Sequence, residues 1–194
     1  MGRVVVFESV SLDGVMQAPA RPDEDRRGGF ERGGWAVPYA HPSMWEDMDL
    51  GTGRGLLLGR RTYEDFFAVW PNQTDNPFTD VLNRAQKYVA STTLREPLPW
   101  MNSTLLTGDI ADSVAELKGD NNLLVLGSGD LVRFLMAHGL VDELILLIHP
   151  LVLGAGVRLF AEDGQALTMK LAETKATPTG VVIATYRAEA RSTD

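Results

Sequence analysis

Two segments of the sequence combine glycines with groups that can bind a phosphate. In residues 123–131 (LLVLGSGDL), an apolar run leads through Gly127, Ser128 and Gly129 into a helical pattern. Glycines let main-chain N–H groups approach a phosphate closely, and a helix N-terminus adds partial positive charge. A complete dinucleotide fingerprint would need glycine at position 132, which is valine. The segment is therefore either a phosphate site or an ordinary strand-to-helix turn.

The second segment, residues 56–63 (LLLGRRTY), places Arg60, Arg61 and Thr62 at the predicted start of a helix. Two guanidinium groups and a hydroxyl can clamp a phosphate. Positive charge at a helix N-terminus is unfavourable unless an anion lies there, which favours a binding site. The alternative is a helix start with solvated arginines. A third glycine-bearing turn, at Gly154 and Gly156, is better explained by a hairpin or a bulge.

Two carboxyl groups near the N-terminus are candidates for proton transfer. Glu8 shares a strand face with Val4 and Val6, so an acid lies at the end of a buried strand. Burial raises the pKa of a carboxyl group, which suits a general acid. The alternatives for Glu8 are a salt bridge or a hydrogen bond from a neighbouring loop. Asp13 precedes Gly14 in a predicted turn and is the second candidate.

Aromatic side chains follow in Trp35, Tyr39 and Trp45, which could form the wall of a planar-ligand site. Core packing is the alternative for all three. Residues 18–34 are rich in Gly, Pro and charge, which predicts a long surface loop that could cover a pocket. The histidines are too scattered for a metal site, and the chain has no cysteine, which excludes thiolate chemistry.

The elements that must position these groups follow from apolar patterning. Continuous runs rich in Val, Ile and Leu predict strands buried on both faces of an α/β sheet. They lie at 4–7, 56–58, 88–90, 123–126 and 144–148. Apolar residues at helical spacing predict helices at 63–70 and 131–138, and a shorter helix is expected at 113–118. A closing antiparallel pair is expected at 144–150 and 181–186, with a further strand at 168–173. We therefore expect a sheet that is mostly parallel at first and antiparallel at its C-terminal edge.

Length and charge limit the classes of function. The chain has 194 residues, which fits one domain over 1–194. Its 18 basic and 26 acidic residues give a net charge of −8, which argues against nucleic acid and anionic membranes as partners. The sequence contains no run of eighteen apolar residues, so no membrane-spanning helix is predicted. We expect a cytoplasmic protein.

In their order along the chain, five motifs resemble the dihydrofolate-reductase-like superfamily, especially the branch related to the reductase domain of riboflavin biosynthesis. They are SVSLDG (9–14), LLGRRTY (57–63), KYVAS (87–91), LGSGDL (126–131) and PLVLGAG (150–156) followed by LF (159–160). The resemblance covers almost the whole chain and implies a three-layer α/β/α sandwich with a central mixed sheet. It also implies a homodimer. The missing cysteines exclude the zinc deaminase domain that accompanies the riboflavin enzyme.

The resemblance further implies an NADPH cofactor. Phosphate contacts would come from Gly59, Arg60, Arg61 and Thr62, and contacts to the adenosine 2′-phosphate from Ser91 and Thr92. The pyrophosphate would lie on Gly127, Ser128, Gly129, Asp130 and Leu131, and the nicotinamide would be bordered by Val15, Met16 and Gln17. Dihydrofolate reductases place an acid on their first helix to hold the substrate ring. Here Asp49 is a substrate candidate, but no motif matches it securely.

Together these features predict a stand-alone NADPH-dependent reductase of a planar, heterocyclic molecule that resembles a pterin or an aminopyrimidine. Glu8 is the first candidate for proton donor or substrate orienter. Trp35, Tyr39 and Trp45 would form the substrate wall. The alternative is a non-catalytic nucleotide-binding protein that retains the fold.

Overall fold

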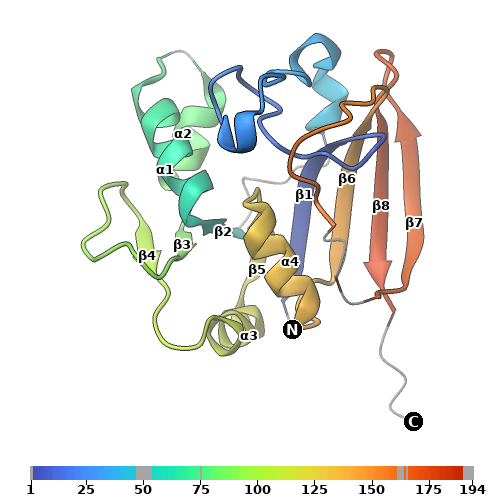
Figure 1. Cartoon of the computed structure of the whole chain (residues 1–194). Helices are drawn as coiled ribbons and strands as arrows, with labels where there is room; N and C mark the ends of the chain where they lie inside the picture. The colour runs from blue at the N-terminus through green and yellow to red at the C-terminus, as the bar shows by residue number, and fades with distance from the viewer. Residues whose placement is uncertain (1, 47–53, 75, 161–163, 165, 190–194) are drawn as a thin grey trace. The chain divides into compact units, whose positions relative to one another are not determined.

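The computed structural model describes residues 2–46, 54–74, 76–160, 164 and 166–189 (Figure 1). Its helices are α1 (Arg60–Val69), α2 (Pro77–Arg84), α3 (Ile110–Asp120) and α4 (Gly129–Ala137). Its strands are β1 (Val4–Ser11), β2 (Arg54–Gly59), β3 (Lys87–Ala90), β4 (Ser103–Leu105), β5 (Asn122–Val125), β6 (Glu143–His149), β7 (Met169–Ala176) and β8 (Val182–Ala188). Short 3-10 turns lie at Arg27–Gly29, Val37–Tyr39, Pro42–Met44 and Trp70–Asn72.

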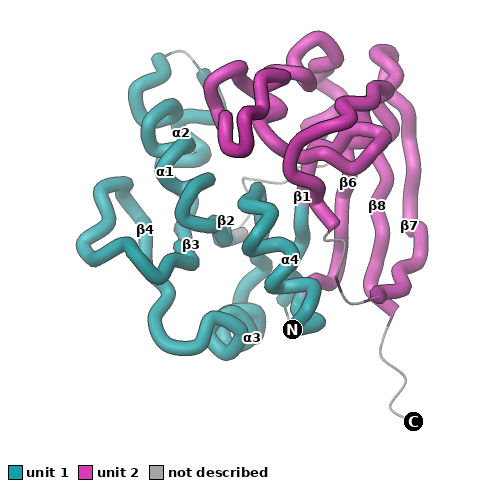
Figure 2. The backbone as a smooth tube through the Cα atoms, viewed as in Figure 1, with its two compact units in different colours: residues 1–6, 49–140 teal, residues 7–48, 141–194 magenta. Residues whose placement is uncertain are grey.

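The chain forms two compact units (Figure 2). Unit 1 comprises residues 1–6 and 49–140, and unit 2 comprises residues 7–48 and 141–194. Strand β1 runs through both, because its first residues belong to unit 1 and the remainder to unit 2. The prediction of a single domain over the whole chain stays a prediction.

Unit 1 holds the parallel part of the sheet. Its hydrogen-bonded strand order is β4-β3-β2-β5-β1, and each of these pairs is parallel. Gly59 pairs with Ala90, and Leu57 pairs with Val125. Parallel pairing brings the carboxyl ends of β2, β3 and β5 to one edge of the sheet, so the segments that follow these strands begin there.

Helices α1 and α4 form where the apolar spacing predicts them. In α1, Tyr63 is buried, its ring stacks with Phe67, and its hydroxyl accepts a hydrogen bond from the Trp100 main-chain N–H at 3.0 Å. In α4, Leu131, Val132 and Leu135 are buried. The helix ends before Gly139, whose φ of +65° lies in the left-handed region, as its position in the sequence indicates.

In unit 2 the strand order is β1-β6-β8-β7, and the antiparallel pairs are β6 with β8 and β8 with β7. Strands β6 and β8 pair antiparallel, with Leu144 opposite Tyr186, and β7 and β8 pair antiparallel with an irregularity between Leu171 and Glu173. The α/β class and the parallel-then-antiparallel order are therefore confirmed. Residues 151–157 form an irregular segment rather than the hairpin or bulge expected there.

Strand burial agrees with the continuous apolar runs. Seven of the eight residues of β1 are buried, and Leu56, Leu57 and Leu58 of β2 are 0 or 1% exposed. A strand buried on both faces carries apolar residues at successive positions, because neither face meets water. Among the described residues, no helix has the length and apolar character to cross a bilayer.

Lys87 is a fully buried cation that joins α2 to the sheet of unit 1. Its ammonium group donates to the carbonyl oxygens of Leu82 and Ala85, each at 2.7 Å, and lies 3.4 Å from that of Asn83. The same nitrogen lies 4.5 Å from the centre of the Trp100 ring. The carbonyls of Leu82 and Ala85 at the helix C-terminus are satisfied in this way, and that of Asn83 also accepts from the Asn102 side chain at 3.0 Å. Burial lowers the pKa of Lys87 to about 8.

We expect Lys87→Met to destabilise the protein by about 2 kcal/mol, because it leaves buried carbonyl oxygens without a donor. Urea denaturation followed by circular dichroism measures the change. Lys170→Met, at an exposed position of β7, is the matched control, and its effect should stay within about 0.5 kcal/mol. Equal denaturation midpoints for the two variants would show that the Lys87 contacts contribute nothing to stability.

Candidate functional site

The two phosphate-type turns predicted from the sequence lie against each other in unit 1. The Gly59 N–H donates to the Gly127 carbonyl at 3.4 Å, and a Cβ atom on Gly59 would overlap the hydroxyl of Ser128. Only glycine fits at position 59 without moving Ser128. Gly127 has a φ of +97°, which also favours glycine. The turn that starts α1 and the turn that starts α4 are therefore in direct contact, and they are here called the paired turns (residues 59–62 and 127–131).

The paired turns present two helix N-termini. Neither N-cap residue, Gly59 for α1 or Ser128 for α4, gives its helix a side-chain hydrogen bond. The first N–H groups of a helix have no partner within the helix, and together with the helix dipole they favour an anion. The Leu131 side chain is buried, so Leu131 could contact a ligand through its main chain.

The arginines of the paired turns are matched with carboxylates. Arg60 lies 3.1 Å from Glu64, and Arg61 lies 3.4 Å from Asp130. Asp130 also pairs with Arg133. All these side chains are at least partly exposed, and such ion pairs contribute little free energy. An incoming phosphate could therefore replace the carboxylates at small cost.

Ser91 and Thr92 follow β3 at the same edge of the sheet, because Ala90 pairs with Gly59 of β2. The Ser91 hydroxyl accepts from the main-chain N–H groups of Thr93 and Leu94 at 3.1 and 3.0 Å. Thr92 is exposed. The sequence-predicted residues of unit 1 thus gather at one sheet edge, although their contact with a ligand stays a prediction.

In unit 2, Asp13 holds two distant segments together. Its carboxylate accepts from the Leu153 and Gly154 main-chain N–H groups at 3.0 and 2.8 Å and from the Ser11 hydroxyl at 2.7 Å. Arg158 donates to the Asp13 carbonyl at 3.0 Å. Hydrogen bonds from Leu153, Ser11 and Gly154 lower the pKa of Asp13 to about 2, so this carboxylate is ionised at neutral pH and has no proton to donate.

The predicted nicotinamide border belongs to the same set of contacts. The Gln17 side chain donates to the carbonyls of Asp25 and Arg27 and accepts from the Val157 N–H at 2.9 Å. Val15 is fully buried and Met16 is half-buried. Contacts of Val15 and Gln17 with a ligand would therefore come from main-chain atoms.

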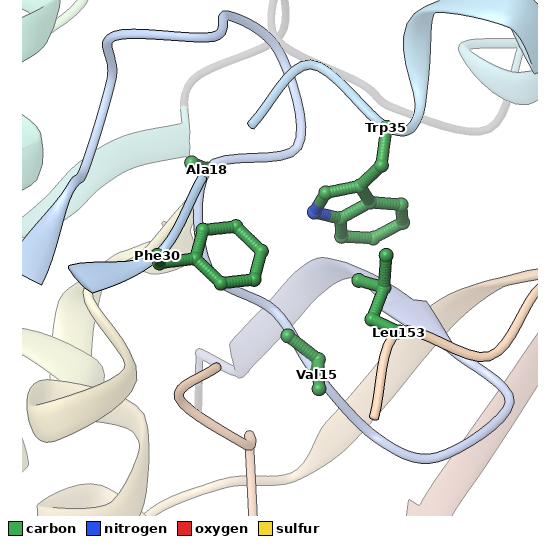
Figure 3. Close-up of a cluster of buried hydrophobic side chains, with 5 residues drawn as sticks. All are labelled: Val15, Ala18, Phe30, Trp35 and Leu153. Atoms are coloured by element: carbon green, nitrogen blue, oxygen red, sulfur yellow. The ribbon is translucent and has the colours of Figure 1, made fainter. Parts of the chain in front are cut away.

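The loop at residues 18–34 is anchored by apolar side chains (Figure 3). Ala18, Phe30 and Trp35 pack with Val15 and Leu153 in one buried cluster. The Trp35 ring N–H donates to the Gln17 carbonyl at 2.7 Å. Gly156 closes the cluster, because its φ is +119° and a Cβ there would lie 2.7 Å from Val15 and 2.8 Å from Phe30. The predicted surface loop is thus anchored in the core at Ala18 and Phe30.

The three aromatic residues of the predicted substrate wall differ in surroundings. Trp35 is 7% exposed and lies in the buried cluster, as the packing alternative expects. Tyr39 is half-buried, and Trp45 is 39% exposed with its ring centre 5.8 Å from that of Phe7. Their role as a wall stays a prediction. The fourth substrate candidate, Asp49, lies outside the described residues.

Glu8 is buried as the sequence predicts, and the neighbouring charge that acts on it is that of another acid, Glu24. The residue is 8% exposed, and its Oε1 atom is buried without a hydrogen-bond partner among the described residues. Burial, with a smaller contribution from the nearby charge of Glu24, raises the pKa of Glu8 to about 8. At neutral pH the carboxyl group is therefore mostly protonated, which is the state a general acid requires.

Sequence reasoning did not single out His149, the last residue of β6. Its ring is fully buried, packs edge-on against Trp35 and Tyr39, and holds Nδ1 at 2.9 Å from the Leu147 carbonyl. Burial lowers the pKa of His149, so the ring is neutral at pH 7. A histidine at the end of an apolar run carries no spacing signal, so the sequence gives no means to identify it.

Comparison with known proteins identifies the family to which this chain belongs. The family model described as the RibD C-terminal domain matches residues 3–183. The uncharacterized protein YyaP of Bacillus subtilis (strain 168) is 28% identical over 192 residues, which cover 95% of this chain and 94% of YyaP.

Solved structures show the same fold. A putative riboflavin biosynthesis protein from Shewanella sp. PV-4 has a TM-score of 0.74 at 23% identity, covering 98% of this chain and 100% of that one. Dihydrofolate reductase from Enterococcus faecalis, complexed with NADP(H) and RAB-propyl, has a TM-score of 0.61 at 12% identity, covering 97 and 98%. The resemblance inferred from the five motifs and the fold class are confirmed.

We expect Asp13→Asn to destabilise the protein by about 1 to 2 kcal/mol at pH near 6, because the amide loses the charge and one acceptor oxygen. A pKa lowered in the folded state stabilises above the unfolded pKa, here about 4, and this contribution is lost as the pH falls towards about 2. The stability gap between wild type and variant, measured by urea denaturation, should therefore narrow at about pH 3. A gap of equal size at both pH values would contradict this, and Asp120→Asn, exposed at the end of α3, is the control.

Proposed function

Because the chain belongs to the RibD C-terminal domain family, we propose that it is an NADPH-dependent reductase of a planar, heterocyclic small molecule. The observation that carries the proposal is the contact between the paired turns of unit 1, at Gly59 and Ser128. Two residue patterns that separately suggested phosphate binding prove to be neighbours. An elongated polyanion such as a dinucleotide would engage both at once.

The residues of the paired turns fit the phosphates of NADPH by their chemistry. Two helix N-termini without side-chain caps offer main-chain N–H donors. Arg60 and Arg61 add guanidinium donors, whose present ion pairs with carboxylates a phosphate would replace. Ser91 and Thr92 would add hydroxyls for the 2′-phosphate. NADPH, when bound, supplies the hydride.

The residues of unit 2 supply the remaining tasks in this proposal. Glu8 holds a proton on its carboxyl group at neutral pH and is the proton donor, or orients the substrate. Asp13 is better suited to positioning, because it is ionised and fixes the segments around Val15, Met16 and Gln17. The substrate wall in this proposal would come from Trp35, Tyr39 and Trp45.

Assembly and location rest on the resemblance and on composition. A homodimer and a cytoplasmic location stay proposals, and sedimentation velocity at several protein concentrations tests the first.

We expect Arg60→Ala and Arg61→Ala to weaken NADPH binding about tenfold or more, because each removes a charged donor to phosphate. A larger loss for NADPH than for NADH would assign the arginines to the 2′-phosphate, whereas equal losses would assign them to the pyrophosphate. Calorimetric titration measures the NADPH and NADH affinities of each variant. Arg84→Ala, at the exposed end of α2, is the control. If wild-type protein neither binds NADPH saturably nor gains heat stability from it, the reductase proposal fails.

We expect Glu8→Gln to leave NADPH affinity unchanged and to lower turnover by about a hundredfold, because an amide cannot transfer the proton. The assay is NADPH oxidation with a panel of pterins, flavins, quinones and aminopyrimidines. Unchanged turnover would remove Glu8 from the reaction. NADPH binding without oxidation by any panel member would favour the non-catalytic nucleotide-binding alternative.

A further inference from the structure

We propose that Asp130 is an internal counter-ion of the paired turns and determines which anions the phosphate site of unit 1 accepts. Its carboxylate pairs with guanidinium groups that a phosphate would use, and its charge disfavours small anions that lack the rest of the cofactor. The inference rests on the proposed function, because it concerns the specificity of that same phosphate site. It also adds Arg133 to the groups that would bind phosphate.

The first support is the position of Asp130 between two helices. Its Oδ2 atom lies 3.4 Å from an Nη atom of Arg61 on α1, and its Oδ1 atom accepts a hydrogen bond from Arg133, one turn further along α4. One carboxylate therefore gathers two guanidinium groups from the two helices that begin at the paired turns. Guanidinium groups bind carboxylates and phosphates with similar geometry, so the same two groups suit a phosphate.

The second support is the balance of charge where the two helices begin. Residues 60–65 and 129–133 carry equal numbers of arginines and acids, namely Arg60, Arg61, Arg133, Glu64, Asp65 and Asp130. Residues 91–94 and 106–108, which follow β3 and β4 at the same sheet edge, carry no charged side chain. Without the charge of Asp130 the set would be net positive, at two helix N-termini that already favour an anion. Asp130 supplies the negative charge that balances the set.

The charge of Asp130 stays beside the site when an anion enters. Its exposed ion pairs are broken at small cost, but a short side chain keeps the carboxylate at the first turn of α4. Like charges at short range repel each other, and the repulsion grows with the charge of the ligand. Inorganic pyrophosphate carries more charge than the diester pyrophosphate of a dinucleotide, and it has no nicotinamide or adenosine to offset the repulsion. Asp130 therefore disfavours the free anion more than the cofactor.

The other carboxylate at the paired turns, Glu64, provides an internal comparison. It pairs with Arg60 at 3.1 Å within α1, so this ion pair does not join the two helices. Glu64 also lies beyond the first turn of its helix, which contains no acid. Loss of its charge should therefore affect an anion at the paired turns less than loss of the Asp130 charge.

The test is calorimetric titration of the full-length protein with inorganic pyrophosphate and with NADPH at low salt. Asp130→Asn keeps the shape of the side chain and removes its charge. We expect this variant to bind pyrophosphate at least about tenfold, and NADPH about threefold, more tightly than wild type. Both gains should become smaller at about 0.5 M salt, because salt screens repulsion between exposed charges. Glu64→Gln and Asp112→Asn, the latter in the exposed first turn of α3, are the controls and should stay within about twofold of wild type.

Two further variants separate the charge of Asp130 from its other contributions. Asp130→Glu keeps the negative charge and should bind pyrophosphate within about threefold of wild type. Adding Arg133→Ala to Asp130→Asn should remove most of the gain in pyrophosphate affinity, because Arg133 is one of the two donors that the loss of the carboxylate makes available. Circular dichroism of each variant checks that the protein remains folded.

Three results would overturn the inference: equal pyrophosphate affinity for Asp130→Asn and Asp112→Asn, weaker binding of both ligands by Asp130→Asn, or a gain that salt leaves unchanged. The second result would make Asp130 a support for the arginines. NADPH titration of the wild type separates this failure from that of the reductase proposal. Normal NADPH binding with any of the three results refutes the counter-ion role alone. A charge-dependent gain in pyrophosphate affinity, in a protein that does not bind NADPH, would instead refute the reductase.

Discussion

Unit 2 depends on one ionised carboxylate at the turn after β1. Asp13 accepts hydrogen bonds from the main chain of Leu153 and Gly154, which lie about 140 residues further along the chain. These bonds hold residues 150–158 beside residues 11–17, and the buried cluster of Val15, Phe30 and Leu153 forms on that frame. Gly156 must then be glycine, because the frame leaves no room for a side chain between Val15 and Phe30. The loop at residues 18–34, which contains Ala18 and Phe30 of this cluster, gains a fixed course in this way.

Asp13 and Glu8 show how surroundings divide the chemistry of two nearly identical groups. Both residues lie in the same short stretch of chain, and their carboxyl groups have similar pKa values in water. Three N–H or O–H donors around Asp13 stabilise its anion, whereas Glu8 is desolvated and has an acid as its charged neighbour. One group therefore holds structure as an anion, and the other keeps a proton available. A pair of carboxyl groups whose pKa values are driven apart is a frequent sign of divided roles in an enzyme.

Much of the fold can be predicted from the sequence, because strands buried on two faces and helices with one apolar stripe leave strong patterns. Strand β4, with three residues, is too short to leave one, and α2 has a usable signal in Asn76 and Pro77 that the apolar spacing did not reinforce. Lys87 shows a further limit, since a lysine normally indicates a surface and here caps a helix inside unit 1. The strand-to-helix turns before α1 and α4 and the burial of Glu8 could be predicted. The contact of Gly59 with Ser128 could not, because it depends on β5 lying beside β2, and one sequence does not reveal strand order.

The close packing of Gly59 on Ser128 has a consequence for the thermodynamics of ligand capture. With no free space between them, neither turn can shift without displacing the other. A long polyanion that reaches one turn first would meet the second already in place, so the second contact forms as an intramolecular event at high effective concentration. The entropy of ordering both helix starts is lost once, during folding, and not again with each phosphate. This chelate effect would let individually weak anion contacts, on a chain of net charge −8, together retain the polyanion proposed above.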